Sequence, residues 1–389
     1  MTLRQITDYF YHITKNFNYL LIIQIIPILI ISSMLVKEIN PKLYHAQMVY
    51  YTLSLIVFIF ASYVPWKKIL WFFAPLSYIG NTLLLFAVLV AGKTILGAKR
   101  WLALPGGTIQ PSEFMKMSIL LFLAYIISKK PPPKNGYGIV MFITLSLIIL
   151  LPSVLILKEP DLGTTLLLLL GAFGALFIVG INWKIVIPLV VALAFIVPVG
   201  YKYALKPYQK KRIEDFLGKP SYQVQQALIA IGSGGLEGKN KDEATQTQLK
   251  FLPVSSTDFI FAYLGERFGF KGMVIIVVLY ILLIIHLLII SKIYSKDYEI
   301  VVISSGLSVL FFVYMGVNIY MVIGLAPVVG APLPMFSHGG TSFIIFSFLF
   351  GVLENLISFK GYKQYNSDTK IEMIKRMKDP ILRHRKKGL

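Results

Sequence analysis

Long apolar runs separated by short polar connections dominate the chain, and the runs have the length of membrane spans. A helix needs about 20 predominantly apolar residues to cross roughly 30 Å of hydrocarbon, and about ten runs approach or exceed that length. They cover residues 19–36, 48–64, 70–91, 114–127, 138–157, 162–181, 185–205, 260–290, 300–325 and 342–357. The pattern predicts an all-α polytopic membrane protein with about ten transmembrane helices.

Two connections and one run differ from the rest. Residues 206–257, between the seventh and eighth runs, form a larger polar loop with a helical pattern at 222–231. Prolines and glycines at 324–342 forbid a continuous helix, and irregular backbone at membrane depth persists only where protein or a wet cavity satisfies it. The eighth run is long for one span and carries Glu266 and Arg267, so we expect a broken or partly exposed turn at its start.

Composition excludes a soluble globular protein. Hydrophobic residues make up 56% of the chain and charged residues 14%, and the mean hydropathy is +0.73. The absence of cysteine excludes disulfides and thiolate metal sites. We therefore expect one ten-span membrane domain over residues 1–359, followed by a basic tail over residues 360–389.

Lysine and arginine predict the orientation, because they concentrate on the cytoplasmic side of membrane proteins. The short connections and the tail place both termini in the cytoplasm and the 206–257 loop outside. The net charge of +20 needs no nucleic-acid partner, since anionic membrane lipid attracts a basic tail by about 1 kcal/mol per Lys or Arg. On this orientation the charged residues beside the runs share the outer side: Arg100, Glu113, Lys116, Asp161 and Asp258.

Glu113 and Lys116 are the first candidate pair. They follow Pro111, which suits a first helical turn, and their spacing of three places them on one helix face as an ion pair. A lone charge at the bilayer centre costs about 2.5 to 3.5 kcal/mol or more. The pair either lets the helix tolerate both charges or lines a polar cavity, and intramembrane ionisable residues usually do the latter.

Two aspartates directly precede apolar runs. Asp161 can cap the helix that follows it, and capping alone would explain an aspartate there. Asp258 is the better candidate base, because burial at a membrane boundary raises a carboxylate pKa toward the range useful for taking a hydroxyl proton. His338, beside Gly339 and Gly340, reads as a local hydrogen-bonding group rather than a catalytic or metal-binding residue.

Six motifs occur in a fixed order between about residues 90 and 345. They read Gly-Ala-Lys-Arg-Trp, Gln-Pro-Ser-Glu-x-x-Lys, Glu-Pro-Asp-x-Gly-Thr, Gln-Ala-Leu-Ile-Ala-Ile-Gly-Ser-Gly-Gly-Leu, Thr-Asp-Phe-Ile-Phe-Ala and Pro-Leu-Pro-x-x-Ser-x-Gly-Gly. This series resembles the SEDS family of shape, elongation, division and sporulation proteins. Residues 245–249 before Phe251, Leu252 and Pro253 resemble the elongation branch typified by RodA more than the division branch typified by FtsW.

The resemblance implies a peptidoglycan glycosyltransferase of the bacterial cytoplasmic membrane, active during cell elongation. Such a protein joins lipid II units into a growing lipid-linked glycan on the outer face and works with a class B penicillin-binding transpeptidase. By motif, Asp258 would be the essential carboxylate, and Glu113 and Lys116 the buried ion pair. The remaining matched residues would line the substrate or pyrophosphate cavity: Lys99, Arg100, Trp101, Asp161, Ser337, Gly339 and Gly340.

An α-linked lipid pyrophosphate donor and a β-1,4 product imply inversion, so Asp258 could act as the base of a single displacement. Lys99, Arg100 and residues 210–212 could hold the pyrophosphate. No motif with ligand spacing identifies a cofactor, and a divalent cation, Mg²⁺ or Mn²⁺, between the pyrophosphate and Asp161 or Asp258 is an open alternative.

The chain departs from the family pattern at three positions. Val254 and Ser256 stand where the family usually has Glu and His, and His338 often has a Tyr counterpart. If the usual His assists the neighbouring base, this protein must manage without it.

Two other functions compete with the transferase. A flippase for lipid-linked precursors would carry ionisable residues through mid-span positions and broken helices in both halves, whereas the charges here crowd the outer boundary. In a non-catalytic scaffold for a transpeptidase, the outer carboxylates would be dispensable.

Overall fold

The computed structural model describes residues 3–95, 98–104, 107–203, 210, 214, 216, 218, 220–249 and 251–378. Within these residues nine helices are long and apolar enough to cross a membrane. They are α2 (Tyr19–Ile39), α3 (Pro41–Tyr63), α4 (Trp66–Ala91), α5 (Pro111–Lys129), α6 (Ile139–Lys158), α7 (Leu162–Gly180), α12 (Ile260–Ile293), α13 (Tyr298–Val322) and α14 (Gly340–Lys378). Helix α8 (Trp183–Tyr203) occupies the seventh expected span, so the polytopic helical fold is confirmed.

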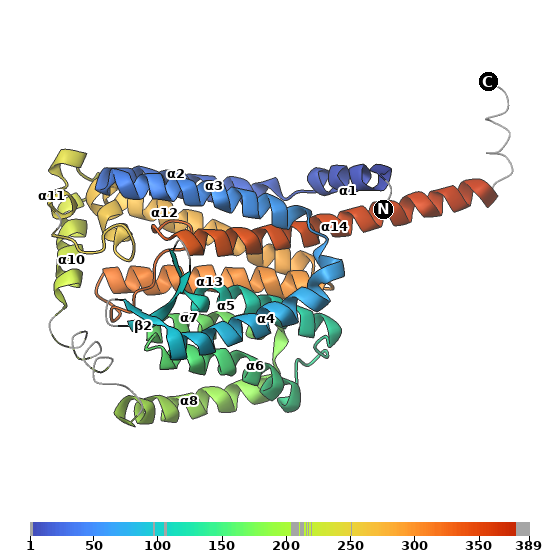
Figure 1. The fold of residues 1–389 in the computed structure, drawn as a ribbon, viewed down its shortest axis with the longest axis horizontal. Helices are drawn as coiled ribbons and strands as arrows, with labels where there is room; N and C mark the ends of the chain where they lie inside the picture. The colour runs from blue at the N-terminus through green and yellow to red at the C-terminus, as the bar shows by residue number, and fades with distance from the viewer. Residues whose placement is uncertain are drawn as a thin grey trace, which may run out of the picture.

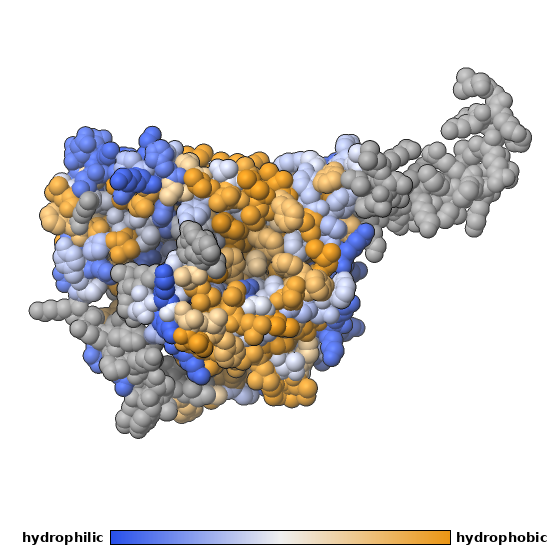
Figure 2. All heavy atoms as spheres, in the orientation of Figure 1, coloured by the Kyte–Doolittle hydropathy of each residue, from blue (hydrophilic) through white to orange (hydrophobic). Residues whose placement is uncertain are grey.

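The helices run roughly parallel in one bundle (Figure 1). Helix α13 lies in the interior and packs against α5, α7 and α12, while α3 packs along α14. In the 18-residue apolar stretches of α13 and of the membrane part of α14, 72% and 78% of the residues are buried. The corresponding shares in α2, α3 and α4 are 22% to 28%. Exposed apolar side chains form a broad band on the surface, as a lipid-facing surface requires (Figure 2).

The two ends of the bundle differ in what they carry. One end, here called the Asp258 end, holds the connections α2–α3, α4–α5, α6–α7, α8–α12 and α13–α14. The opposite end, called the termini end, holds α1 (Leu3–Lys15), which packs against α14 (Figure 1). All charged candidates of the sequence analysis lie at or near the Asp258 end.

A small antiparallel sheet joins α4 to α5, and the apolar pattern did not predict it. Its strands are β1 (Lys93–Ile95), β2 (Ala98–Leu104) and β3 (Gly107–Ile109), in that order. Two of the three strands have only three residues, too short to show an alternating pattern. The fold is therefore helical with one short sheet, and β2 carries Arg100.

The large loop contains α10 (Tyr222–Gly234), the short 3₁₀ turn η1 (Lys241–Glu243) and α11 (Thr245–Gln248). The expected helix at 222–231 is confirmed. Helix α10 packs closely on α12, where a Cβ atom at Gly234 would collide with the carbonyl oxygen of Gly265. The loop thus covers the start of α12.

The expected break in the eighth span is confirmed, but its start is not exposed. Glu266 is fully buried, and its carboxylate accepts from the Gln246 backbone at 2.9 Å and from the Thr247 hydroxyl at 2.9 Å. The chain breaks afterwards at Gly269, whose φ of 61° favours glycine and whose missing side chain lets Gly238 approach. Hydrogen bonds from loop residues therefore stabilise this buried carboxyl group.

Candidate functional site

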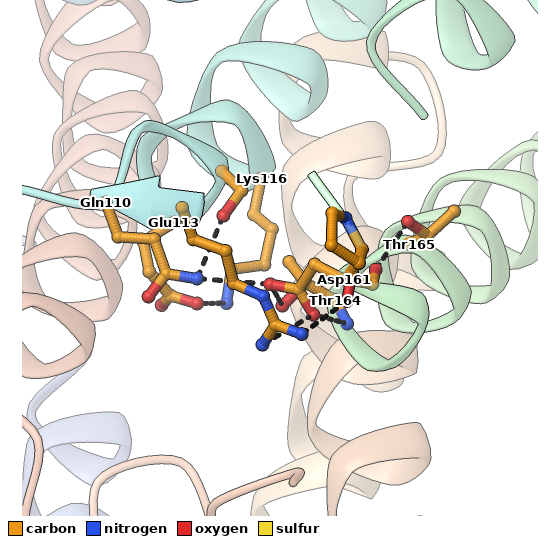
Figure 3. A network of polar contacts seen from close by, with 9 residues as sticks. Gln110, Glu113, Lys116, Asp161, Thr164 and Thr165 are labelled. Carbon is orange, nitrogen blue, oxygen red and sulfur yellow. Dashed lines mark hydrogen bonds and ion pairs between the residues drawn. The ribbon is translucent and has the colours of Figure 1, made fainter. Parts of the chain in front are cut away.

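Asp161 is the centre of a polar network at the start of α7. As N-cap it accepts from the Thr164 amide at 3.1 Å and from the Thr164 hydroxyl at 2.9 Å, so the expected cap is present. Its second oxygen also accepts from the side-chain amide of Gln110 at 3.2 Å (Figure 3). The Asp161 side chain is only 5% exposed, so these donors are what keeps a buried carboxylate stable.

Arg100 brings a positive charge to this network from β2. Its Nη1 lies 3.5 Å from Asp161 Oδ1, and its Nη2 donates to the carbonyl of Pro160. The Arg100 side chain remains 27% exposed. The neighbouring Lys99 turns elsewhere: its ammonium donates to the carbonyls of Leu89 and Val90 at 2.8 and 2.9 Å and so caps the end of α4.

Glu113 and Lys116 form the ion pair that their spacing predicts. Lys116 Nζ lies 2.7 Å from Glu113 Oε1, and the lysine side chain is 3% exposed. The same ammonium lies 2.5 Å from the hydroxyl of Tyr314 on α13, a partner that the sequence analysis missed. The pair therefore ties α5 to the central helix.

Asp258 lies in the turn that leads into α12 and is half-buried. Asn318 of α13 donates to the Asp258 carbonyl at 2.8 Å and to the Ala331 carbonyl at 2.7 Å. Asn318 lies one helical turn after Tyr314, so one face of α13 contacts both Lys116 and the Asp258 turn. Val254, at the start of this turn, has a φ of 53°, a strained backbone for a β-branched residue.

The irregular connection between α13 and α14 brings the two aspartates to a common surface. A Cβ atom at Gly163, next to the Asp161 network, would collide with the Val329 carbonyl, and one at Gly330 would lie 3.5 Å from Asp258 Oδ2. Ser337 donates to the Thr257 carbonyl at 2.7 Å and accepts from the Leu333 amide at 2.8 Å. The Pro- and Gly-rich segment is thus folded against the Asp258 turn.

Gly339, Gly340 and His338 continue this segment. A Cβ atom at Gly340 would overlap the ring of Tyr50, whereas Gly339 faces open space. The His338 amide donates to the Ser256 carbonyl at 2.9 Å, whereas its ring Nε2 is buried without a hydrogen-bond partner among the described residues. Burial lowers the pKa of its imidazole.

Glu159 is a carboxyl group that the sequence analysis did not single out. It is 1% exposed, and neither carboxylate oxygen has a hydrogen-bond partner among the described residues. Burial and the nearby Asp161 charge raise the pKa of Glu159 to about 8, while Arg100 acts in the opposite direction. A second acidic group, protonated near neutral pH, therefore borders the Arg100 and Asp161 pair.

The remaining residues expected at the site have fewer described contacts with it. Trp101 is half-buried in β2 and pairs through its backbone with Lys93. Of the basic stretch, Lys210 lies within the described residues, whereas Lys211 and Arg212 lie outside them, as does Gly97. Over the part of the chain that the structure describes, no three His, Cys, Asp or Glu side chains gather to hold a metal ion.

The fold and the site define the chain as a polytopic membrane protein with a charged site at one end of its helix bundle. Comparison with known proteins assigns the chain to a family. A family model described as a cell cycle protein of the FtsW, RodA and SpoVE type matches residues 10–362. The chain is 47% identical to peptidoglycan glycosyltransferase MrdB of Helicobacter pylori (strain ATCC 700392 / 26695) over 91% of its length and 93% of the relative. It is 37% identical to MrdB of Escherichia coli (strain K12) over 78% and 82%.

Solved structures agree with this assignment. The chain is similar, with a TM-score of 0.77 and 27% identity, to a chain of a peptidoglycan synthase complex described as coordinating polymerization and crosslinking, over 89% of this chain and 98% of that one. It is also similar to the Thermus thermophilus rod shape determining protein RodA in an aspartate-to-alanine mutant, with a TM-score of 0.65, 26% identity and coverage of 88% and 96%. The chain belongs to the SEDS family, as its motifs indicate.

Proposed function

We propose that this protein is a peptidoglycan glycosyltransferase that polymerises lipid II on the outer face of the bacterial cytoplasmic membrane during cell elongation. The relatives named as peptidoglycan glycosyltransferases, at up to 47% identity, support the activity, and the RodA-like structure supports the role in cell shape. One observation carries the site assignment: the Asp258 turn and the Asp161 network meet on the same Pro- and Gly-rich segment.

In the proposed reaction Asp258 takes the proton from the 4-hydroxyl of the acceptor sugar. The acceptor oxygen forms a bond to the anomeric carbon of the donor, and the bond from that carbon to the pyrophosphate oxygen breaks with its electron pair. A single displacement of this kind inverts an α-linked donor into a β-1,4 product. The fixed backbone of Asp258, bonded through Asn318, supports its use as a positioned base.

Arg100 is the proposed cation for the leaving pyrophosphate. It is partly exposed and held by Asp161 and Pro160, and a guanidinium binds phosphate oxygens with two parallel donors. Lys99 is the weaker candidate, because its ammonium already caps α4. Asp161 or Asp258 would hold a divalent cation if one is used, since Mg²⁺ commonly takes few protein ligands, and the ion would stabilise negative charge on the leaving pyrophosphate.

A class B penicillin-binding transpeptidase is the proposed partner. The similarity to a chain of a synthase complex that coordinates polymerization and crosslinking supports this pairing. The positive-inside distribution of lysine and arginine supports an outward Asp258 end and cytoplasmic termini. The basic tail at 360–389 would then face anionic lipid.

The test is lipid II polymerisation by the purified protein with its cognate transpeptidase in lipid nanodiscs, beside lipid II transport in sealed vesicles. Glycan strands from the pair support the transferase. Transport without polymer would favour a flippase. Transpeptidase stimulation without polymer, and insensitive to loss of Asp258, would favour a scaffold.

A further inference from the structure

A shallow groove opens at the Asp258 end, between the α2–α3 connection and the large loop. Its volume is about 630 Å³, within the range of ligand sites, and its lining includes Lys37, Glu38, Tyr44, His45 and Lys241. Lys37, His45 and Lys241 are exposed, and the Lys37 ammonium lies 5.6 Å from the centroid of the Tyr44 ring. The groove thus combines cations with an aromatic face.

The acidic residue in this lining is already neutralised. Glu38 accepts from Arg267 Nε at 2.6 Å and Nη2 at 2.8 Å, and from the Tyr263 hydroxyl at 2.7 Å. A bidentate pair of this kind uses both carboxylate oxygens. Within the described part of the chain, neither Lys37 nor Lys241 forms an ion pair, so the groove presents net positive charge to a ligand.

The groove adjoins the proposed site. Tyr263, which holds Glu38, lies on the first turns of α12, directly after the Asp258 turn. On the other side, the His338 ring bonds to the backbone of Leu43, and the His338 amide donates to the Ser256 carbonyl at 2.9 Å. Both contacts connect the walls of the groove to the segment that carries Asp258.

We propose that this groove binds the saccharide strand next to the Asp258 site, through its sugar faces and the carboxylates of its attached peptides. The inference rests on the proposed function. Aromatic rings fit the apolar faces of sugars, and lysines pair with carboxylates, so Tyr44 and the two lysines match this strand. A strand held there stays beside Asp258 between additions, which favours long products over early release.

The experiment uses the full-length protein with its transpeptidase in nanodiscs of neutral lipid. It compares wild type with Lys37→Glu/Lys241→Glu for product length and for the rate of the first transfer. We expect strands at least about threefold shorter from the variant, with an unchanged first transfer. Salt should shorten the wild-type strands more than those of the variant, because it screens exposed charges. Lys42→Glu, an exposed reversal on the same connection but outside the groove lining, serves as the control and should leave strand length unchanged.

Binding of soluble, lipid-free glycan fragments with attached peptides is measured in parallel, so failure of polymerisation alone leaves the groove testable. Binding weakened at least about tenfold by the double substitution supports the inference. Equal binding and equal strand length in both proteins overturn it. Shortening that appears only with weakened transpeptidase association also overturns it and assigns the groove to the partner. Parallel nanodiscs of anionic lipid test the other source of negative charge, and shortening seen there but not in neutral lipid overturns the inference and assigns the groove to a headgroup. Absence of polymer from wild type, with binding intact, contradicts the proposed function and leaves the groove supported.

Discussion

The side-chain amide of Asn318 donates to the backbone carbonyl of Asp258 at 2.8 Å, from a position fully inside the bundle. The same nitrogen donates to the Ala331 carbonyl at 2.7 Å, so one residue of α13 fixes both segments that flank the Asp258 carboxylate. The proposed catalytic carboxylate is therefore positioned through its backbone by α13, a helix in the interior of the bundle.

Asn318→Ala should lower polymerisation by about 10- to 100-fold, because a displacement of about 1 Å can cost that much. It should also lower stability, since each buried carbonyl left unpaired costs about 1 to 3 kcal/mol. Asn355→Ala separates the two effects. Asn355 is equally buried at the termini end and bonds to Tyr9 and the Ser62 carbonyl, so its loss should destabilise with little effect on turnover per folded molecule. Equal turnover losses in both variants would contradict the positioning role.

The Glu113 and Lys116 pair should behave as a coupled unit. Glu113→Gln leaves the Lys116 ammonium buried without its counter-charge, and breaking buried pairs typically costs about 3 to 5 kcal/mol. The double variant Glu113→Gln/Lys116→Met removes both charges and should recover part of the loss. Thermal unfolding in detergent of the two single variants and the double variant gives the coupling. Additive losses would show that the charges act independently.

Glu159 should make stability depend on pH. Because the folded pKa of about 8 lies above the ordinary value of 4.5, the folded chain keeps a proton that the unfolded chain has lost between these values. The stability of wild type should therefore fall as pH rises through this window and level off above it. Glu159→Gln keeps the shape of the side chain but removes the titratable carboxyl group. The unfolding temperature of this variant should therefore decline less than that of wild type between pH 5 and 8. Parallel profiles for both proteins would refute the assignment.

Arg100→Lys should weaken substrate use although it keeps the charge. A lysine cannot contact Asp161 and Pro160 and still offer two parallel donors to pyrophosphate. Loss of one charged hydrogen bond, about 1.5 to 3 kcal/mol, corresponds to about a 10- to 100-fold fall in kcat/KM for lipid II. The matched neighbour Lys99→Ala should reduce thermal stability without this effect. A similar fall in kcat/KM for Lys99→Ala would contradict the assignment of pyrophosphate binding to Arg100 rather than Lys99.

Local spacing predicted the parts of the site that are close in sequence. The Asp161 cap and the Glu113 and Lys116 pair needed only helical geometry. Tyr314 and Asn318 could not be found this way, because they lie 198 and 60 residues from their partners, inside a run that is mostly apolar. A lone Asn within a span was the one available signal, since polar groups at membrane depth need partners.

Charges at loop contacts were the harder part of the prediction. Glu266 read as an exposed break because its partners, Gln246 and Thr247, sit in a polar loop whose fold the sequence does not fix. Lys99 was paired with Arg100 as a candidate pyrophosphate ligand because the two are adjacent, but adjacency in sequence does not say where each side chain points. In a strand, successive side chains point to opposite faces, and here Lys99 reaches α4 while Arg100 reaches α7.

The most direct test of the central claim compares glycan synthesis by wild type and Asp258→Asn, each purified with its transpeptidase and matched for folding and complex formation. Asparagine has nearly the same size but cannot accept the hydroxyl proton, so we expect a loss of at least about 100-fold. Asp297→Asn, which removes an ion pair with Lys360 at the termini end, should retain activity. Equal polymer from wild type and Asp258→Asn would contradict the claim that Asp258 is the base.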